Sequence, residues 1–231
     1  MKNLQNISAY ITGGTKGIGY AVAESLMAEG ANVTITSRSQ QSAEEAAEQL
    51  DKKGLLGKAL GVEADVRDMK SQQEAVTFGV KAFGKVNVIV ANAGVWHFAS
   101  IQELTAEEWQ ETIDVNLTGV FNSVKAGLDQ LIEHKGYLLT IASLAGTNFF
   151  ATGSAYNASK FGLVGFTQAV MMDVRSPKGV ENQQHKGGID IGHDTIRFRR
   201  RRLGQMLGKV NGERRHPRPA GGVTAGQRHR P

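Results

Sequence analysis

The 231-residue chain contains no cysteine, which excludes disulfides and thiolate metal sites. It contains no apolar run of the ~20 residues needed to span a bilayer. Its first residues, MKNLQN, lack an apolar segment followed by a small-residue cleavage site, so we expect no signal peptide. These absences predict a cytoplasmic protein. The hydrophobic fraction of 40% and the length suit one α/β domain with a full core.

Acidic residues are scarce only in the last part of the chain. Residues 181–231 contain 12 Lys and Arg against 4 Asp and Glu, a net charge of +8. Of the 27 basic and 22 acidic residues in the chain, this leaves 15 and 18 for residues 1–180, a net charge of −3. The overall net charge of +5 therefore comes from residues 181–231 alone, which indicates two differently organised segments.

Strand-like and helix-like runs alternate through the first of these segments. Strands that alternate with helices form a parallel sheet covered on both faces. The sequence therefore predicts an α/β fold with a Rossmann-type, doubly wound parallel sheet. The expected strands are 7–12, 32–37, 59–63, 86–91 and 137–141, and the expected helices are 17–29, 41–53, 69–83, 105–134 (opened by a Thr105–Glu108 capping box) and 156–174.

This alternation stops near Val180. Residues 197–202 read RFRRRR, and no run of four or more alternating or buried apolar residues follows Val180. A segment of this composition cannot bury enough surface to offset its ordering entropy. We therefore predict a folded domain over residues 1–180 and a basic, disordered tail over residues 181–231.

A glycine-rich turn, TGGTKGIG at residues 12–19, lies between the first expected strand and the first expected helix. Glycines let the backbone approach a pyrophosphate, and the following helix N-terminus offers N–H groups and a favourable dipole. A simple strand–helix turn is the alternative, but four glycines in seven residues exceed its needs. The sequence predicts a nucleotide site here, with the candidate contacts Gly13, Thr15, Lys16, Gly17, Ile18 and Gly19.

The end of the second expected strand favours NADP(H) over NAD. Ser37 stands where an acidic residue would accept hydrogen bonds from the adenosine ribose 2′-OH, and Arg38 follows it. Together with Lys16, this places two cations and no carboxylate where a 2′-phosphate would bind. The alternative is that Arg38 is only a solvated surface charge.

Further short motifs follow along the chain. They are Asp65-Val66, Asn92-Ala93-Gly94, Asn116 within VNLTG at 115–119, Ser143, and YNASK at 156–160. With the glycine turn, their order and spacing resemble the short-chain dehydrogenase/reductase family over residues 5–180, and within it the 3-oxoacyl-carrier-protein reductases. Ser143, thirteen residues before Tyr156, is the most telling spacing.

The chemistry of this family explains the residue types. Hydride transfer to a carbonyl leaves an alkoxide that needs a proton, which Tyr156 can supply as a general acid or remove in oxidation. Lys160 lies one helical turn further on the same face, and its positive charge should stabilise the phenolate. Ser143 would hydrogen-bond and polarise the substrate carbonyl. The resemblance also implies that Lys160 binds the nicotinamide ribose and that Asn116 holds a water in a proton relay.

The resemblance extends the expected coenzyme site beyond the glycine turn. It implies that Asp65 contacts the adenine, although Asp65 could instead cap the helix that starts at Met69. The turn at 92–94 would close against the adenosine. The full set implied in this way adds Asp65, Val66, Asn92, Ala93, Gly94, Tyr156 and Lys160 to the residues above.

Substrate and partner expectations follow from the same resemblance. The apolar loops at 96–98 and 149–150 would line a pocket for a ketone, an aldehyde or an acyl chain. His97 fits the rim of such a pocket better than a metal site, because no second His, Asp or Glu stands at ligand spacing, so we predict no metal. A homodimer or homotetramer would form through helices 105–134 and 156–174.

The chain departs from the family after residue 180. Family members continue with a sixth strand, a Pro-Gly loop and a seventh strand, whereas residues 181–188 read ENQQHKGG. The degenerate codons of residues 181–191, advanced by one base, permit a strand-like Gly-Val-Arg-Ile-Ser-Asn-Ile-Lys sequence. We hypothesise that the tail is an out-of-frame translation from about Val180, and we expect the sheet to lack its usual last strands.

Three functions remain open from the sequence. The leading interpretation is an NADPH-dependent reductase acting on a small carbonyl or alcohol substrate. The second is a catalytically impaired member that keeps the motifs but has a damaged C-terminus. The third, a nucleic-acid-binding tail, is disfavoured because only Phe198 interrupts the basic residues 197–202 with an aromatic ring.

Overall fold

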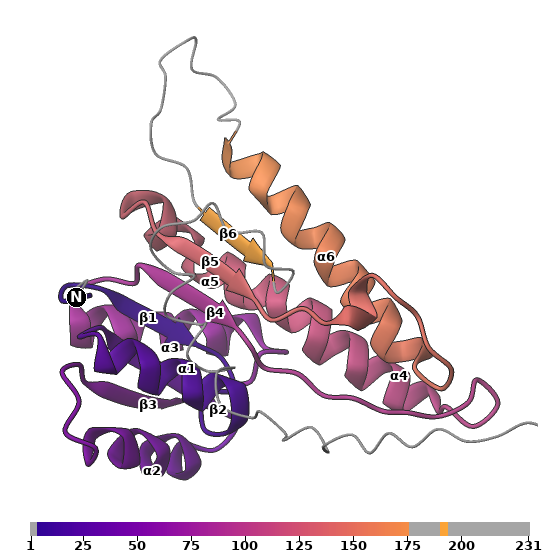
Figure 1. The fold of residues 1–231 in the computed structure, drawn as a ribbon, viewed down its shortest axis with the longest axis horizontal. Coiled ribbons are helices and arrows are strands. Elements are labelled where there is room, and N and C mark those ends of the chain that lie inside the picture. The colour runs from indigo at the N-terminus through magenta and orange to yellow at the C-terminus, as the bar shows by residue number, and fades with distance from the viewer. Residues whose placement is uncertain (1–3, 176–189, 194–231) are drawn as a thin grey trace, which may run out of the picture. The chain divides into compact units, whose positions relative to one another are not determined.

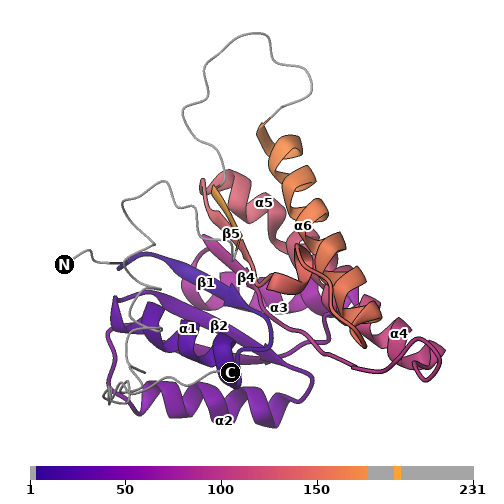
Figure 2. The same ribbon diagram turned by 45° about the vertical axis from the view of Figure 1, so that its right-hand side comes forward.

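The structure, a computed structural model, describes residues 4–175 and 190–193. Its centre is a parallel sheet of six strands in the order β3-β2-β1-β4-β5-β6 (Figures 1 and 2). The predicted doubly wound parallel sheet is confirmed. The strands are β1 Ser8–Ile11, β2 Asn32–Ser37, β3 Ala59–Glu63, β4 Val88–Ala91, β5 Tyr137–Thr140 and β6 Asp190–His193, and the helices are α1 Gly17–Ala28, α2 Gln40–Asp51, α3 Met69–Phe83, α4 Ala106–Ile113, α5 Gly119–Glu133 and α6 Ser154–Arg175.

The strand order reverses between β1 and β4. The chain runs from β1 outwards to β2 and β3, then crosses to β4 on the other side of β1 and continues to β5. In open parallel sheets such a reversal leaves a crevice at the carboxyl ends of the strands, where ligands bind. The loops after β1, β4 and β5 therefore meet at one edge of the sheet.

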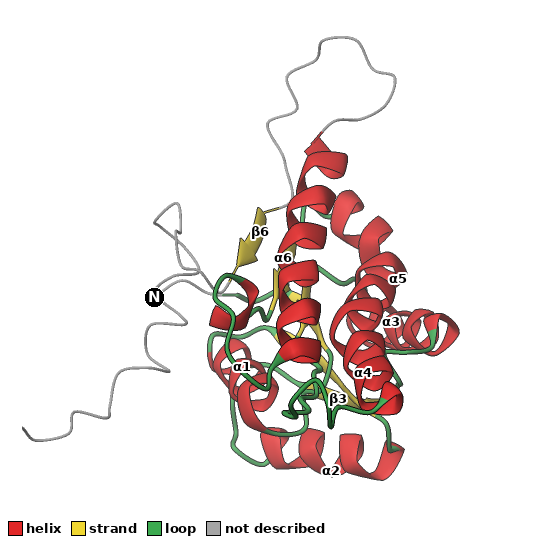
Figure 3. Cartoon of the chain, turned by 90° about the vertical axis from the view of Figure 1, so that its right-hand side faces the viewer, coloured by secondary structure: helices red, strands yellow, loops and turns green. Residues whose placement is uncertain are grey.

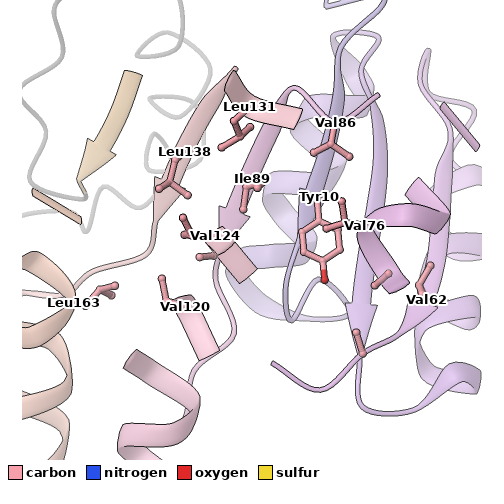
Figure 4. Packing of buried hydrophobic residues seen from close by; sticks show 13 residues of the cluster. Tyr10, Val62, Val76, Val86, Ile89, Val120, Val124, Leu131, Leu138 and Leu163 are labelled. Carbon is pink, nitrogen blue, oxygen red and sulfur yellow. The ribbon is translucent and has the colours of Figure 1, made fainter. Parts of the chain in front are cut away.

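Two layers of helices cover the sheet. α3, α5 and α6 lie on one face, and α1 and α2 lie on the other (Figure 3). The first layer buries a continuous apolar cluster that joins strand side chains to all three helices (Figure 4). Its largest fully buried members include Tyr10, Ile89, Leu131, Leu138 and Leu163.

The expected single helix over residues 105–134 is interrupted. α4 begins with the predicted capping box, in which the Thr105 side chain accepts from the N–H of Glu108 and the Glu108 carboxylate accepts from the N–H of Thr105, each at 3.1 Å. A π-helical turn, Asp114–Thr118, then separates α4 from α5. Such a turn holds one extra residue, which the apolar periodicity of the sequence does not reveal, and it often accompanies a functional site.

A strand also follows Val180, where none was predicted. β6 pairs in parallel with β5, with Leu138 opposite Ile191. The expectation failed because strand pairing needs only an extended backbone beside an unpaired strand edge, and Asp190–His193 has no alternating apolar pattern. The rest of the predicted disordered tail, and the frame hypothesis with it, lies outside the described residues. No helix within the described ranges is long and apolar enough to cross a membrane.

Replacing Ile89 by Ala should destabilise the domain. Ile89 is fully buried in the cluster, so the change leaves a cavity and should lower the free energy of unfolding by about 2–5 kcal/mol. Urea unfolding followed by circular dichroism measures this difference. Ile132→Ala is the matched control, because Ile132 is 55% exposed and its loss should change the free energy by less than about 0.5 kcal/mol. Equal effects of the two changes would contradict the packing described here.

Candidate active site

The glycine turn packs tightly on one side and is open on the other. Gly13 has a φ of 62°, and a Cβ there would lie 3.0 Å from the Cα of Ala93. Gly17 has a φ of 57°, and a Cβ there would meet nothing within 4 Å. No side chain in the described part of the chain caps the N-terminus of α1, which starts at Gly17. The first N–H groups of α1 therefore face an open cradle suited to a phosphate.

Asn92 holds the ends of β1 and β4 together beneath this cradle. Its side-chain Nδ2 donates to the carbonyls of Thr12, at 2.9 Å, and Gly13, at 3.0 Å. In return, the Thr12 hydroxyl accepts from the backbone N–H groups of Asn92, at 3.0 Å, and Ala93, at 3.1 Å. The turn at 92–94 is thus hydrogen-bonded to the glycine turn and holds it in place.

The two cations predicted for a 2′-phosphate lie on the surface next to the cradle. Lys16 directly precedes α1 and Arg38 directly follows β2, and both are exposed. Neither side chain makes an ion pair within 4.0 Å with any described residue. Ser37 ends β2, and its carbonyl accepts from Ala64 at 2.7 Å. Two exposed cations that make no ion pair with the described residues suit an anionic ligand.

Asp65 lies on the same side of the site and is paired with Arg67. The Arg67 guanidinium donates to both carboxylate oxygens, with Nη2 2.6 Å from Oδ2. This hydrogen bonding lowers the pKa of the Asp65 carboxyl, and the positive charge of Arg38 contributes in the same direction. The alternative role of Asp65 as a helix cap is wrong, since Asp68 caps α3 by accepting a hydrogen bond from the backbone N–H of Lys70.

The reactive residues come together where β5 ends against α6. Lys160 is buried, with only 6% of its surface exposed, and its Nζ donates to the carbonyl of Ile141 at 2.8 Å. The same Nζ lies 5.7 Å from the centroid of the Tyr156 ring. Ser143 follows two residues after Ile141 and begins a 3₁₀ turn, Leu144–Gly146, by accepting from Ala145 at 3.2 Å. The Lys160 contact therefore places Tyr156 and Lys160, on α6, beside the segment that leads from β5 to Ser143.

Asn157 secures this arrangement, and sequence reasoning did not single it out. Its Nδ2 donates to the carbonyls of Ala145 and Asn148, each at 2.9 Å. These bonds fasten the segment after Ser143 to the first turn of α6. The only available signal was a polar residue at a position that the helix turns out to bury, inside the YNASK motif.

Asn116 lies in the π-helical turn and is fully buried. Its Oδ1 accepts from the N–H of Val95, while its Nδ2 donates to the carbonyl of Val95, both at 2.8 Å. Nδ2 also lies 3.2 Å from the Ser159 hydroxyl. The side chain therefore joins the loop after β4 to α6, next to the reactive residues. Its expected role in holding a water stays a prediction.

The two apolar loops meet at Tyr156. The Phe98 ring packs edge-on against Tyr156, with centroids 5.8 Å apart, and against Phe150, with centroids 5.7 Å apart. Ala99 donates to the carbonyl of Thr152 at 3.0 Å, which joins the loops through their backbones. Together with the exposed Trp96, these rings form an apolar rim beside the reactive tyrosine.

His97, between Trp96 and Phe98, does have acidic partners. Its Nε2 lies 2.8 Å from a carboxylate oxygen of Glu111, and its Nδ1 lies 3.8 Å from one of Glu108. Sequence spacing gave no sign of these partners, because α4 folds back onto the loop and brings together residues that are distant in sequence. No group of three or more potential metal ligands is present among residues 4–175 and 190–193.

The remaining predicted coenzyme contacts fall around the same crevice. Val66 is buried, and its carbonyl accepts from Asn122 at 2.8 Å. The described positions of the others are Thr15 in the turn between β1 and α1, Ile18 exposed and Gly19 buried in the first turn of α1, and Ala93 and Gly94 directly after β4.

Comparison with known proteins gives a consistent match. The family model for short chain dehydrogenases matches residues 8–186. The chain is 34% identical over 185 residues to a trans-4-hydroxycyclohexanecarboxylate dehydrogenase of Sinomonas cyclohexanicum, covering 78% of this chain and 71% of that protein. It is 35% identical over 170 residues to a 3-oxoacyl-[acyl-carrier-protein] reductase of Salmonella typhimurium, covering 73% and 67%. It spans only half the length of a 38% identical 3-dehydrosphinganine reductase of Arabidopsis thaliana, a match that covers 72% of this chain.

Solved structures agree with these relatives. An alcohol dehydrogenase of the archaeon Thermococcus sibiricus, complexed with 5-hydroxy-NADP, superposes with a TM-score of 0.69 at 32% identity, covering 72% of this chain and 71% of that one. A short chain dehydrogenase/reductase of Burkholderia phymatum in complex with NAD superposes with a TM-score of 0.73 at 25% identity, covering 84% and 66%. The two neighbours therefore differ in the coenzyme that they hold.

The Asp65–Arg67 pair should make stability depend on pH. Because the pair lowers the pKa of Asp65 in the folded state, its contribution is present above the unfolded pKa and is lost as the pH falls through the folded pKa. Asp65→Asn should therefore lower the free energy of unfolding at pH 7 but change it little near pH 3. Denaturant unfolding at both pH values measures this. An equal loss at both would show that the carboxylate charge is not responsible.

Proposed function

Because the chain belongs to the short-chain dehydrogenase/reductase family, we propose that it is an NADPH-dependent oxidoreductase that interconverts a carbonyl compound and an alcohol. The observation that carries this proposal is the buried Lys160 ammonium beside Tyr156, at the strand end that also supplies Ser143. A buried cation next to a phenol favours the charged, proton-accepting form of the phenol.

Each reactive residue has a distinct task in this proposal. When bound, NADPH supplies the hydride. Ser143 donates a hydrogen bond to the substrate carbonyl oxygen and polarises it. Tyr156 gives its phenolic proton to that oxygen in reduction and takes it back in alcohol oxidation. Lys160 stabilises the phenolate that remains and contacts the ribose of the nicotinamide, and Asn116 holds a water that returns the proton.

The preference for NADP(H) rests on the residues around the adenosine ribose. Arg38 and Lys16 form no ion pair within 4.0 Å of any described residue, and Ser37 places no carboxylate at the end of β2. Gly17 opens the cradle in which the pyrophosphate would contact the N–H groups of α1. Asp65 would contact the adenine through its carboxylate, next to Arg38.

The apolar rim favours a carbonyl substrate with a bulky apolar part. Trp96, Phe98 and Phe149 are 65%, 56% and 87% exposed, so an apolar substrate would gain by covering them. The solvent-facing Phe121 and Phe161, on α5 and α6, suit contacts with a second copy, so we propose a homodimer or homotetramer. We propose that the catalytic domain extends beyond residue 180, because β6, Asp190–His193, pairs with β5 in its sheet.

Tyr156→Phe should abolish most turnover. Removing the proton donor should lower kcat at least about 100-fold while the Kd for NADPH changes by less than about twofold. NADPH oxidation with a panel of apolar ketones and a fluorescence titration of NADPH measure the two quantities. Tyr137→Phe is the matched control, because Tyr137 lies on β5 outside the site.

The outcomes separate the candidate functions. Unchanged turnover by the Tyr156→Phe variant would contradict the role of the tyrosine. A wild-type chain that binds NADPH but oxidises it with no ketone would instead support the catalytically impaired member of the family.

Arg38→Ala should weaken NADPH and spare NADH. Loss of a charge-assisted phosphate contact should raise the Kd for NADPH about 10- to 100-fold and leave that for NADH unchanged. Ser37→Asp should do more, since the new carboxylate repels the 2′-phosphate and accepts from a 2′-OH. Calorimetric titrations with both coenzymes measure these values. Tighter binding of NADH than of NADPH by the wild-type chain would refute the assignment.

A further inference from the structure

His97 is held between two carboxylates of α4. Its Nε2 lies 2.8 Å from Oε2 of Glu111, and its Nδ1 lies 3.8 Å from Oε1 of Glu108. The three side chains are each between 29% and 37% exposed, so the pair is partly shielded from solvent. Both ring nitrogens of one imidazole therefore face acidic oxygens.

This geometry suits one charge state of the ring. A neutral imidazole has a single N–H donor, whereas the imidazolium donates from both nitrogens. Histidine is also the side chain that changes charge between about pH 5 and pH 8. The arrangement is therefore strongest when His97 is protonated and both carboxylates are ionised.

The loop that His97 anchors carries the apolar rim. Its neighbour Phe98 contacts both Tyr156, with ring centroids 5.8 Å apart, and Phe150, at 5.7 Å. On the other side of the loop, Val95 is bonded through both its N–H and its carbonyl to Asn116. Further along the loop, Ala99 donates to the carbonyl of Thr152. Between Val95 and Ala99, the side chain of His97 joins the loop to α4 through Glu111.

We propose that His97, through its contact with Glu111, is a positioning residue. It holds Phe98 of the apolar rim against Tyr156 and so governs the binding of bulky apolar carbonyl substrates. This rests on the proposed function for its effect on turnover. The contact of His97 with Glu111 holds the loop in place, and its removal loosens the packing of Phe98 against Tyr156. The substrate affinity of the enzyme then depends on a residue that does not touch the reacting atoms.

Other charged groups act on the same pair. Glu108 and Glu111 face His97 from α4, and Arg67, in the loop before α3, interacts electrostatically with Glu111. Arg67 also interacts with Asp114 of the π-helical turn. Arg67 and His97 both interact with Glu111. Glu111→Gln therefore removes a partner of both residues, whereas His97→Gln removes only the contact between the loop and α4.

The first test needs no turnover. The chain contains two tryptophans, so Trp109→Phe leaves Trp96, adjacent to His97, as the sole reporter of the loop. In this background we expect His97→Gln and Glu111→Gln to raise the acrylamide quenching of Trp96, because each change removes the contact between the loop and α4. Glu108→Gln should raise it less, because its contact with His97 is longer.

The matched control is Glu107→Gln, a change of the same kind on the same helix. Glu107 makes no ion pair or side-chain hydrogen bond with the described residues, so this variant should keep the wild-type quenching profile. A profile in His97→Gln identical to that of its Trp109→Phe parent would overturn the proposal. So would an equal effect of Glu107→Gln and Glu111→Gln.

The second test separates positioning from catalysis. His97→Gln should raise KM for a bulky apolar ketone about three- to tenfold, with kcat and the Kd for NADPH nearly unchanged. A loss of kcat with unchanged KM would contradict a positioning role. If no variant, including the wild type, turns over any ketone, the dehydrogenase assignment fails while the quenching titration still decides the anchor.

Discussion

The ammonium of Lys160 is buried where the sheet, the reactive helix and the turn after β5 meet. A charge removed from water is tolerated only when polar groups compensate it. The carbonyl of Ile141 does so at the end of β5, which obliges α6 to cross that strand end at one register. The same contact holds Tyr156, one helical turn before Lys160, beside the segment that leads to Ser143. The chemistry and the packing of this region thus depend on one buried cation.

Three buried or half-buried asparagines join the other loops of the crevice to the elements around them. Asn92 joins the ends of β1 and β4, Asn116 joins the loop after β4 to α6, and Asn157 joins α6 to the turn after Ser143. An amide side chain both donates and accepts, so each can satisfy loop backbone groups that no strand or helix partner reaches. Loops that lack regular structure are in this way hydrogen-bonded to the strands and helices around them.

The openings left by this framework are as informative as its bonds. Three features of the crevice are left open to a ligand. They are the N-terminus of α1, which no side chain of the described residues caps, the exposed cations Lys16 and Arg38, and the exposed apolar rim around Phe98. These open groups suit an extended ligand with an anionic end and an apolar end. The proposed NADPH-linked carbonyl oxidoreductase would bind such a ligand.

Much of this architecture is readable in the chain itself. The strands at 32–37 and 59–63 and the helix at 69–83 lie where their patterns predicted, because each pattern reflects burial against neighbours that any parallel sheet provides. The π-helical turn at 114–118 was missed, since one inserted residue leaves the apolar spacing almost unchanged. β6 was missed because its pairing uses backbone groups that a side-chain pattern does not report.

The sequence by itself determined the fold class and the glycine turn, and it predicted Ser143, Tyr156 and Lys160 as the reactive residues, because these depend on residue type and local spacing. Only the tertiary structure decided what depends on distant segments meeting. It paired His97 with Glu111, joined Asn116 to the backbone of Val95, and showed Asn157 fastening α6 to the turn after Ser143. Each of these contacts forms between loops and helices whose mutual placement comes from packing, and no local pattern in the chain encodes that placement.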